Sequence, residues 1–182
     1  QHLGRNTGLK LGIPLDQMVV WDPFKRLGGN TEDQLRQAKL VLWRGHCSVH
    51  TRFTPGQIKA ARERYPDITV IAHPECPMET VQAADLVGST EFIRKMINEG
   101  PPGSKWAVGT EISLVNRLAI NNPDKVVFCL DPVTCPCSTM YRIHPAYLCW
   151  VLEGLVEGQV VNQITVPEDI KQESRVALDR ML

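Results

Sequence analysis

Short apolar runs alternate with more polar stretches along most of the chain, and this pattern predicts the secondary structure. The apolar runs have the length and the β-branched content of strands. Stretches of about ten residues between them carry helix start and stop signals, such as Thr54 followed by Pro55. We expect strands at 18–21, 40–43, 68–72, 85–88, 105–108 and 125–130, helices at 31–39, 54–65, 78–84, 91–99, 112–120, 145–157 and 167–182, and a loop over 1–17.

This alternation indicates the class of fold. Strands that alternate with helices of about ten residues are typical of right-handed βαβ units and a parallel sheet. The four predicted strands between residues 68 and 130 suffice for a small three-layer domain. The sequence therefore predicts an α/β fold, a three-layer αβα domain with a four-stranded parallel sheet, followed by C-terminal helices.

Polar or reactive residues follow every strand of this predicted domain. In a parallel sheet the carboxyl ends of the strands share one edge, and open α/β folds bind their ligands there. We therefore predict that these side chains meet at one edge of the sheet. They are His73 and Glu75, Ser89 and Thr90, Thr110 and Glu111, and Cys137.

The cysteines add a second signal. Cys47 and Cys137 each follow a predicted strand and lie about one small domain apart, which indicates a weak internal repeat. Cysteines brought from distant loops to one centre are typical of iron–sulfur or zinc ligation, but each could also be a buried, inert thiol. Cys76 is a weaker candidate ligand, and Cys135 is a neighbour or a ligand. Cys129 and Cys149 lie in apolar runs and are expected to be buried.

The remaining candidates are a histidine–glutamate pair and two hydroxyls. Alternate residues of an extended segment point the same way, so His73 and Glu75 can address one ligand by acid–base chemistry or by anchoring an acidic substrate. The plainer alternative is a satisfied loop histidine and a solvated glutamate. Ser89 and Thr90 precede a helix, where they would either dock a carboxylate or phosphate or simply cap the helix. His50 carries a weaker signal.

Composition and charge narrow the function classes. Apolar residues make up 43% of the chain, charged residues 22%, and the formal net charge is zero, so nothing favours binding to nucleic acid or an anionic membrane. No apolar run approaches the roughly 20 residues that span a bilayer. Residues 1–10 are polar and carry no secretory signal, which favours a reducing, cytoplasmic compartment. The chain starts with Gln in a predicted loop, and we expect it to be a fragment of a longer protein.

Five motifs in this order resemble those of quinolinate synthase, over nearly the whole chain. They are Trp43-x-Gly45-x-Cys47-x-Val49-His50, His73-Pro74-Glu75-Cys76, Ala84-Asp85-x-x-Gly88-Ser89-Thr90, Gly109-Thr110-Glu111 and Cys137-x-x-Met140. The resemblance implies three αβα domains around a pseudo-threefold axis, each giving one cysteine to a [4Fe–4S] cluster whose open iron is a Lewis acid. It implies a transferase that condenses iminoaspartate with dihydroxyacetone phosphate to quinolinate in NAD biosynthesis, with L-aspartate oxidase as a possible supplier of the imine.

The resemblance also assigns domains and residues. Residues 1–50 correspond to the C-terminal part of the second αβα domain, 51–140 to the third domain and 141–182 to a C-terminal helical segment. Cys47 and Cys137 match cluster ligands, and the substrate-contacting positions fall on His50, His73, Glu75, Ser89 and Thr90. His73 and Glu75 are the catalytic candidates, with Glu75 in proton transfer.

Two departures from the family pattern affect the expectation. The first domain, most of the second and the third cluster cysteine have no counterpart here, so we expect the isolated chain to be inactive. The segment 9–29 is longer than expected and has no assigned role. The alternative hypothesis is a metal-binding or redox-sensing αβα module without catalytic activity, using Cys135 and Cys137 with Cys47 or His73.

Overall fold

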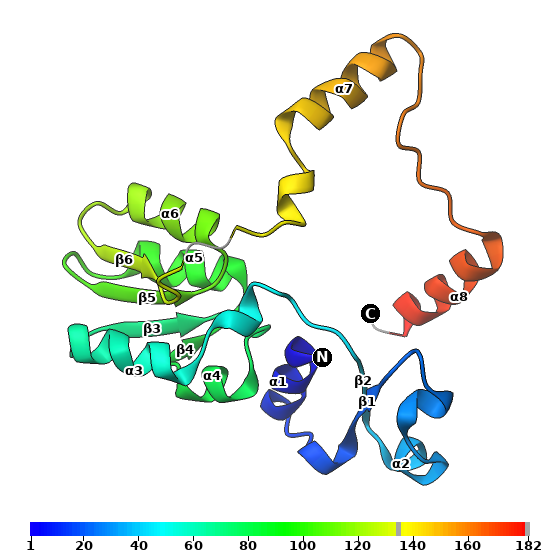
Figure 1. Ribbon diagram of the computed structural model, residues 1–182, viewed down its shortest axis with the longest axis horizontal. Helices are drawn as coiled ribbons and strands as arrows, with labels where there is room; N and C mark the ends of the chain where they lie inside the picture. Colours follow the sequence, from blue (N-terminus) through cyan, green and yellow to red (C-terminus); the bar gives the residue numbers. More distant parts are fainter. Residues whose placement is uncertain (134–135, 181–182) are drawn as a thin grey trace. The chain divides into compact units, whose positions relative to one another are not determined.

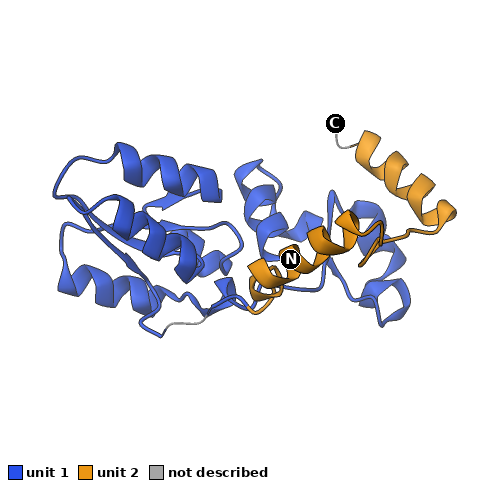
Figure 2. Ribbon diagram, turned by 90° about the horizontal axis from the view of Figure 1, so that it is seen from above, with its two compact units in different colours: residues 1–137 blue, residues 138–182 orange. Residues whose placement is uncertain are grey.

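The structure is a computed structural model of the chain and describes residues 1–133 and 136–180 (Figure 1). It divides into two compact units, Gln1–Cys137 and Ser138–Leu182, coloured separately in Figure 2. The first unit holds both sheets and the candidate site residues that the structure describes. The domain division at residues 50 and 140 stays a prediction.

The first unit is built on a four-stranded sheet. Its strands are β3 (Thr69–Ala72), β4 (Leu86–Val87), β5 (Lys105–Gly109) and β6 (Val126–Cys129), in the order β4-β3-β5-β6. All three neighbouring pairs are parallel. The predicted α/β class with a four-stranded parallel sheet is therefore confirmed.

Helices cover both faces of this sheet (Figure 1). On one face, α3 (Pro55–Arg64) and α4 (Met78–Ala83) enclose a buried cluster that contains Val70. On the other face, α5 (Thr90–Glu99) and α6 (Ile112–Asn121) enclose a second cluster that contains Ile71. Neighbouring residues of β3 thus enter opposite cores, as the two-residue period of a strand requires.

The predicted start of α3 is confirmed. The Thr54 hydroxyl accepts a hydrogen bond from the Gln57 amide at 3.3 Å, and the Gln57 side chain accepts one from the Thr54 amide at 2.9 Å. Pro55 occupies the first turn, where its missing N–H has no intrahelical partner to lose. These two reciprocal hydrogen bonds fix the residue at which α3 begins after the Cys47 segment.

The first residues were predicted as a loop, and that prediction is wrong. They form helix α1 (His2–Lys10), although Gly4 and Gly8 lower its intrinsic helix propensity. A β-carbon on Gly8 would lie 2.6 Å from Met18 Cε, so the absent side chain lets α1 approach the neighbouring strands. The buried Asn6 donates from Nδ2 to the carbonyls of Pro74 at 2.8 Å and Cys76 at 2.9 Å. Tertiary packing therefore overrides local propensity here.

A two-stranded parallel sheet leads into the Cys47 segment. Its strands, β1 (Met18–Trp21) and β2 (Leu40–Trp43), lie where the sequence predicts them and pair over their full length. Between them lie η2 (Arg26–Gly29) and α2 (Glu32–Gln37), and η1 (Leu15–Gln17) precedes β1.

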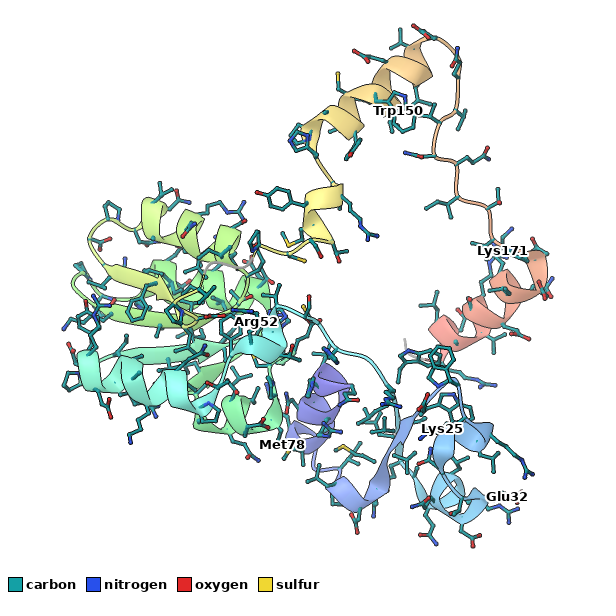
Figure 3. The ribbon with its side chains drawn as sticks, in the orientation of Figure 1. Lys25, Glu32, Arg52, Met78, Trp150 and Lys171 are labelled. Carbon is teal, nitrogen blue, oxygen red and sulfur yellow. The ribbon has the colours of Figure 1, made fainter. Side chains whose placement is uncertain are left out.

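The second unit consists of helices. It contains η4 (Met140–Arg142), α7 (Pro145–Val156) and α8 (Glu168–Asp179), so the two predicted C-terminal helices are confirmed. Many apolar side chains of α7 are exposed, including Trp150, which Figure 3 labels. Across 1–133 and 136–180, no helix combines the length and the apolar character needed to cross a membrane.

Candidate functional site

The segment after β2 forms a single helical turn that carries Cys47 and His50. The Cys47 carbonyl accepts hydrogen bonds from the Thr51 amide at 3.2 Å and the Thr51 hydroxyl at 3.1 Å. Turn η3 (His50–Arg52) follows directly. Residues three apart on a helical turn lie on the same side, so the Cys47 thiol and the His50 imidazole face one region.

His50 is the buried centre of the site. Its side chain is 10% exposed, and its Nδ1 lies 2.8 Å from Glu75 Oε2, which is ion-pair distance without the N–H alignment of a regular hydrogen bond. Its Nε2 lies 3.2 Å from the Thr110 hydroxyl. Burial lowers the pKa of His50, while the carboxylates of Glu75 and Glu111 oppose that shift. The imidazole is therefore largely neutral near pH 7.

His73 stacks on this imidazole. The two ring centroids lie 4.6 Å apart with 19° between the ring planes. Burial lowers the pKa of His73, and the neighbouring His50 lowers it further. His73 Nδ1 accepts a hydrogen bond from the Glu75 amide at 3.3 Å, so in the neutral ring the proton is on Nε2. His73 thus offers an Nε2–H donor.

Three side chains of different chemistry come together around His50. One ligand atom each from Cys47, His50 and Glu75 lies within 4.8 Å of the other two. Sulfur, imidazole nitrogen and carboxylate oxygen are all common ligands of zinc and of other transition metals. The Glu75 side chain is 34% exposed, so this group is reachable from solvent. Cys47 and Glu75 also line a pocket of about 290 Å³ to which the start of α1 contributes.

Two further cysteines are less suited to metal binding than Cys47. Cys76 is fully buried, its Sγ donates to the Gly109 carbonyl at 3.4 Å, and burial raises the pKa of its thiol to about 12. Cys129 is half-buried, and burial raises its thiol pKa as well. In the absence of a metal, burial thus favours the protonated thiol at both positions over the thiolate, which is the form that binds a metal. The weaker expectation for Cys76 as a ligand therefore finds no support in this geometry.

Cys137 is connected to the group through Glu111. The Cys137 amide lies 3.4 Å from Glu111 Oε1, and the Cys137 side chain packs against the same apolar cluster as Cys47. Glu111 is buried at the end of β5, next to the Thr110 that contacts His50. The candidate ligand Cys135 lies outside the described residues.

Ser89 and Thr90 lie at the start of α5 and are exposed. The Ser89 hydroxyl accepts from the Phe92 amide at 3.2 Å, so Ser89 caps the helix as the plainer alternative expects. Ser89 also lines a pocket of about 420 Å³ to which Asn6 and Lys10 of α1 contribute. The expected roles of both hydroxyls in substrate binding stay predictions.

One expectation about the remaining cysteines is wrong. Cys149 was expected to be buried, but it is exposed on α7, where its thiol donates to Glu153 Oε1 at 3.4 Å. The apolar run around it does not pack into a core over the described residues, so the apolar pattern alone is misleading. Sequence reasoning also missed Asn6, because the glycines of α1 gave no helix signal.

The sequence of the chain was compared with protein families and with curated proteins. A family model described as quinolinate synthetase A protein matches residues 10–182. The chain is 62% identical to the quinolinate synthase of Herpetosiphon aurantiacus, 60% to that of Corynebacterium glutamicum and 53% to that of Geobacillus kaustophilus. Each match covers 100% of this chain but only 46% to 49% of the relative. The chain spans about half the length of these curated relatives, and it belongs to the quinolinate synthase family.

Proposed function

We propose that this chain supplies part of the active site of a quinolinate synthase. In this proposal the complete enzyme condenses iminoaspartate with dihydroxyacetone phosphate to quinolinate during NAD biosynthesis, as a transferase. An L-aspartate oxidase that supplies the imine and a cytoplasmic setting belong to the same proposal. The observation that carries it is the convergence of Cys47, His50 and Glu75 at one end of the sheet in a chain of this family.

The residues present fit a [4Fe–4S] cluster in part. Such clusters are held by cysteine thiolates; Cys47 is half-buried beside His50 and Glu75, and Cys137 is half-buried with its amide 3.4 Å from Glu111 Oε1. We assign these two as ligands, and at least one more cysteine must come from outside this chain. When bound, the cluster supplies an open iron that acts as a Lewis acid toward a substrate hydroxyl.

The other residues have roles that follow from their geometry. The partly exposed carboxylate of Glu75 is suited to accept a proton from the substrate, and its contact with His50 holds it in place. The Nε2–H of His73 can donate to a substrate carboxylate, because Nδ1 is already occupied by the Glu75 amide. The neutral His50 imidazole adds no positive charge beside an iron site.

The start of α5 is suited to an anionic group of the substrate. A helix N-terminus presents unpaired amides and a positive dipole end, and in α5 the Ser89 hydroxyl caps the Phe92 amide. The Lys10 side chain lines the same pocket and adds positive charge. This arrangement supports docking of a phosphate or carboxylate close to the His73 turn, whose Pro74 also lines the pocket.

The first test is proton transfer by Glu75. In a chain joined to the complementary half of the Herpetosiphon aurantiacus relative and reconstituted anaerobically with iron and sulfide, Glu75→Gln should lower quinolinate formation by about 10²-fold or more while iron content is retained. Glu79→Gln, on the exposed surface of α4, is the matched control and should leave the rate unchanged. Wild-type turnover in Glu75→Gln would refute the assigned role.

The geometry also favours a second candidate, a single metal ion held by Cys47, His50 and Glu75. One sulfur, one nitrogen and one oxygen ligand within 4.8 Å match the donor types of zinc sites. This set differs from the one predicted for the alternative hypothesis, which combined Cys135 and Cys137 with Cys47 or His73. A colourless protein with one zinc per chain after anaerobic purification would favour this candidate, and a brown, oxygen-sensitive protein would favour the cluster.

A further inference from the structure

The chain segment after β6 is attached to the Cys47 turn by a buried carboxylate. Asp131 is 8% exposed, and its Oδ2 accepts a hydrogen bond from Arg52 Nε at 2.8 Å. Its second oxygen, Oδ1, accepts from the Val133 amide at 3.0 Å. Arg52 belongs to η3, two residues after His50, and Figure 3 labels it beside the sheet. The pair of Arg52 and Asp131 therefore links the two loops that follow β2 and β6.

A second buried carboxylate holds the same segment farther along. Glu111 is 8% exposed and caps α6 through a 2.8 Å hydrogen bond from the Ser113 amide to Oε2. Its other oxygen, Oε1, accepts from the Ser113 hydroxyl at 3.2 Å and lies 3.4 Å from the Cys137 amide. Buried carboxylates thus contact the chain at Val133, through Asp131, and at Cys137, through Glu111.

The backbone next to Arg52 is hydrogen-bonded to another element of the domain. The next residue, Phe53, is 2% exposed, and its carbonyl accepts a hydrogen bond from the buried Thr80 hydroxyl at 2.7 Å. This bond ties the end of η3 to α4. The backbone is thus anchored to α4 one residue after Arg52.

We propose that Arg52, Asp131 and Glu111 are positioning residues that set where Cys137 stands relative to Cys47 and His50. Partly buried ion pairs contribute little net stability but can specify one arrangement, because any other leaves a desolvated charge unpaired. A shared metal or cluster needs its ligands within about 0.5 Å of the productive geometry, which such a link supplies. The inference rests on the proposed function, since it assumes that the two cysteines act at one centre.

The test attaches spin labels to Cys47 and Cys137. Pulsed electron–electron double resonance then measures the width of the distance distribution between the two labels. The 182-residue chain is used with Cys135→Ser and Cys149→Ser, and labelling of the buried Cys76 and Cys129 is checked by mass spectrometry. Arg52→Gln should widen the distance distribution by about twofold. Asp131→Asn removes the other partner of the same ion pair and should widen the distribution by a similar factor. Arg52→Lys keeps the charge and should give an intermediate width.

The matched control is Arg62→Gln in α3. Arg62 also pairs with an aspartate, Asp85, at 2.7 Å, but both side chains are 42% exposed and the pair lies away from the cysteine loops. This variant should leave the width unchanged, and the melting temperature of each variant separates local loosening from unfolding. An unchanged width in both Arg52→Gln and Asp131→Asn, or equal widening in Arg62→Gln, would overturn the inference. The readout needs no metal, so a failure of iron binding in the wild type would count only against the proposed function.

Discussion

Single residues at this site owe their chemistry to their surroundings more than to their place in a motif. Cys47 and Cys76 both follow a strand, and the sequence predicted Cys76 as the weaker candidate ligand. Their surroundings in the structure differ. Cys76 is fully buried and its thiol donates a hydrogen bond to the Gly109 carbonyl, whereas Cys47 is half-exposed beside Glu75.

This difference should be visible in thiol reactivity. At pH 8 a thiol with a pKa of about 12 is only about one part in ten thousand thiolate, so Cys76 should resist alkylation by iodoacetamide. The exposed Cys149 in the same chain serves as an internal control and should react. Peptide mass spectrometry before and after denaturation in guanidinium provides the measurement. Alkylation of native Cys76 as fast as Cys149 would contradict the buried placement.

The sequence predicted His73 and Glu75 on an extended segment, but the structure has them in a turn, closed by the hydrogen bond from the Cys76 amide to the His73 carbonyl at 3.0 Å. The Glu75 carboxylate contacts His50, whose central place the sequence did not predict. The contact of His50 with Thr110 joins residues 60 positions apart and depends on how β5 lies in the sheet. Such long-range contacts leave no local pattern.

Most helices and strands lie close to the ranges that the sequence predicts, and helix α1 is the exception. β1 and β2 coincide with their predicted ranges, and α3 to α6 begin within one residue of prediction, because strong caps and apolar runs define them. Helix α1 was missed, because its stability comes from a buried asparagine and two glycines that allow close packing. Intrinsic helix propensity depends on the local sequence and does not include long-range contacts such as these.

Helix α1 should therefore depend on Asn6. In Asn6→Ala, the carbonyls of Pro74 and Cys76 lose their donor, which should lower the free energy of unfolding by roughly 1–3 kcal/mol. Thr7→Ala, on the exposed side of the same helix, is the control and should change stability little. Urea denaturation followed by circular dichroism gives both values. Equal stability of Asn6→Ala and the wild type would show that these two hydrogen bonds do not stabilise the fold.

At the scale of the whole molecule, the chain is about half as long as the curated relatives it matches. Its first unit has two closed apolar cores, one on each face of the four-stranded sheet. The second unit differs, because α7 exposes Leu148, Leu152 and Leu155, each more than 50%. A helix that is apolar on most sides is normally buried in a larger core.

The isolated chain should consequently bind the dye ANS, which fluoresces on exposed apolar surface. Replacing Leu148, Leu152 and Leu155 together by serine should lower this fluorescence without changing the melting temperature of the first unit. Lys171→Ala in α8, where the lysine side chain is 43% exposed, is the control (Figure 3). Absence of ANS fluorescence in the wild-type chain would mean that these side chains are covered in solution.

The account depends most on one claim, that Cys47 and Cys137 serve a single metal centre. The most direct measurement is iron bound per chain, with visible absorbance, after anaerobic reconstitution of the chain joined to the complementary half of the Herpetosiphon aurantiacus relative. We predict that Cys47→Ala and Cys137→Ala each lose the brown chromophore and most of the iron, while Cys149→Ala retains both. Full iron content and colour in either of the first two variants would contradict the account.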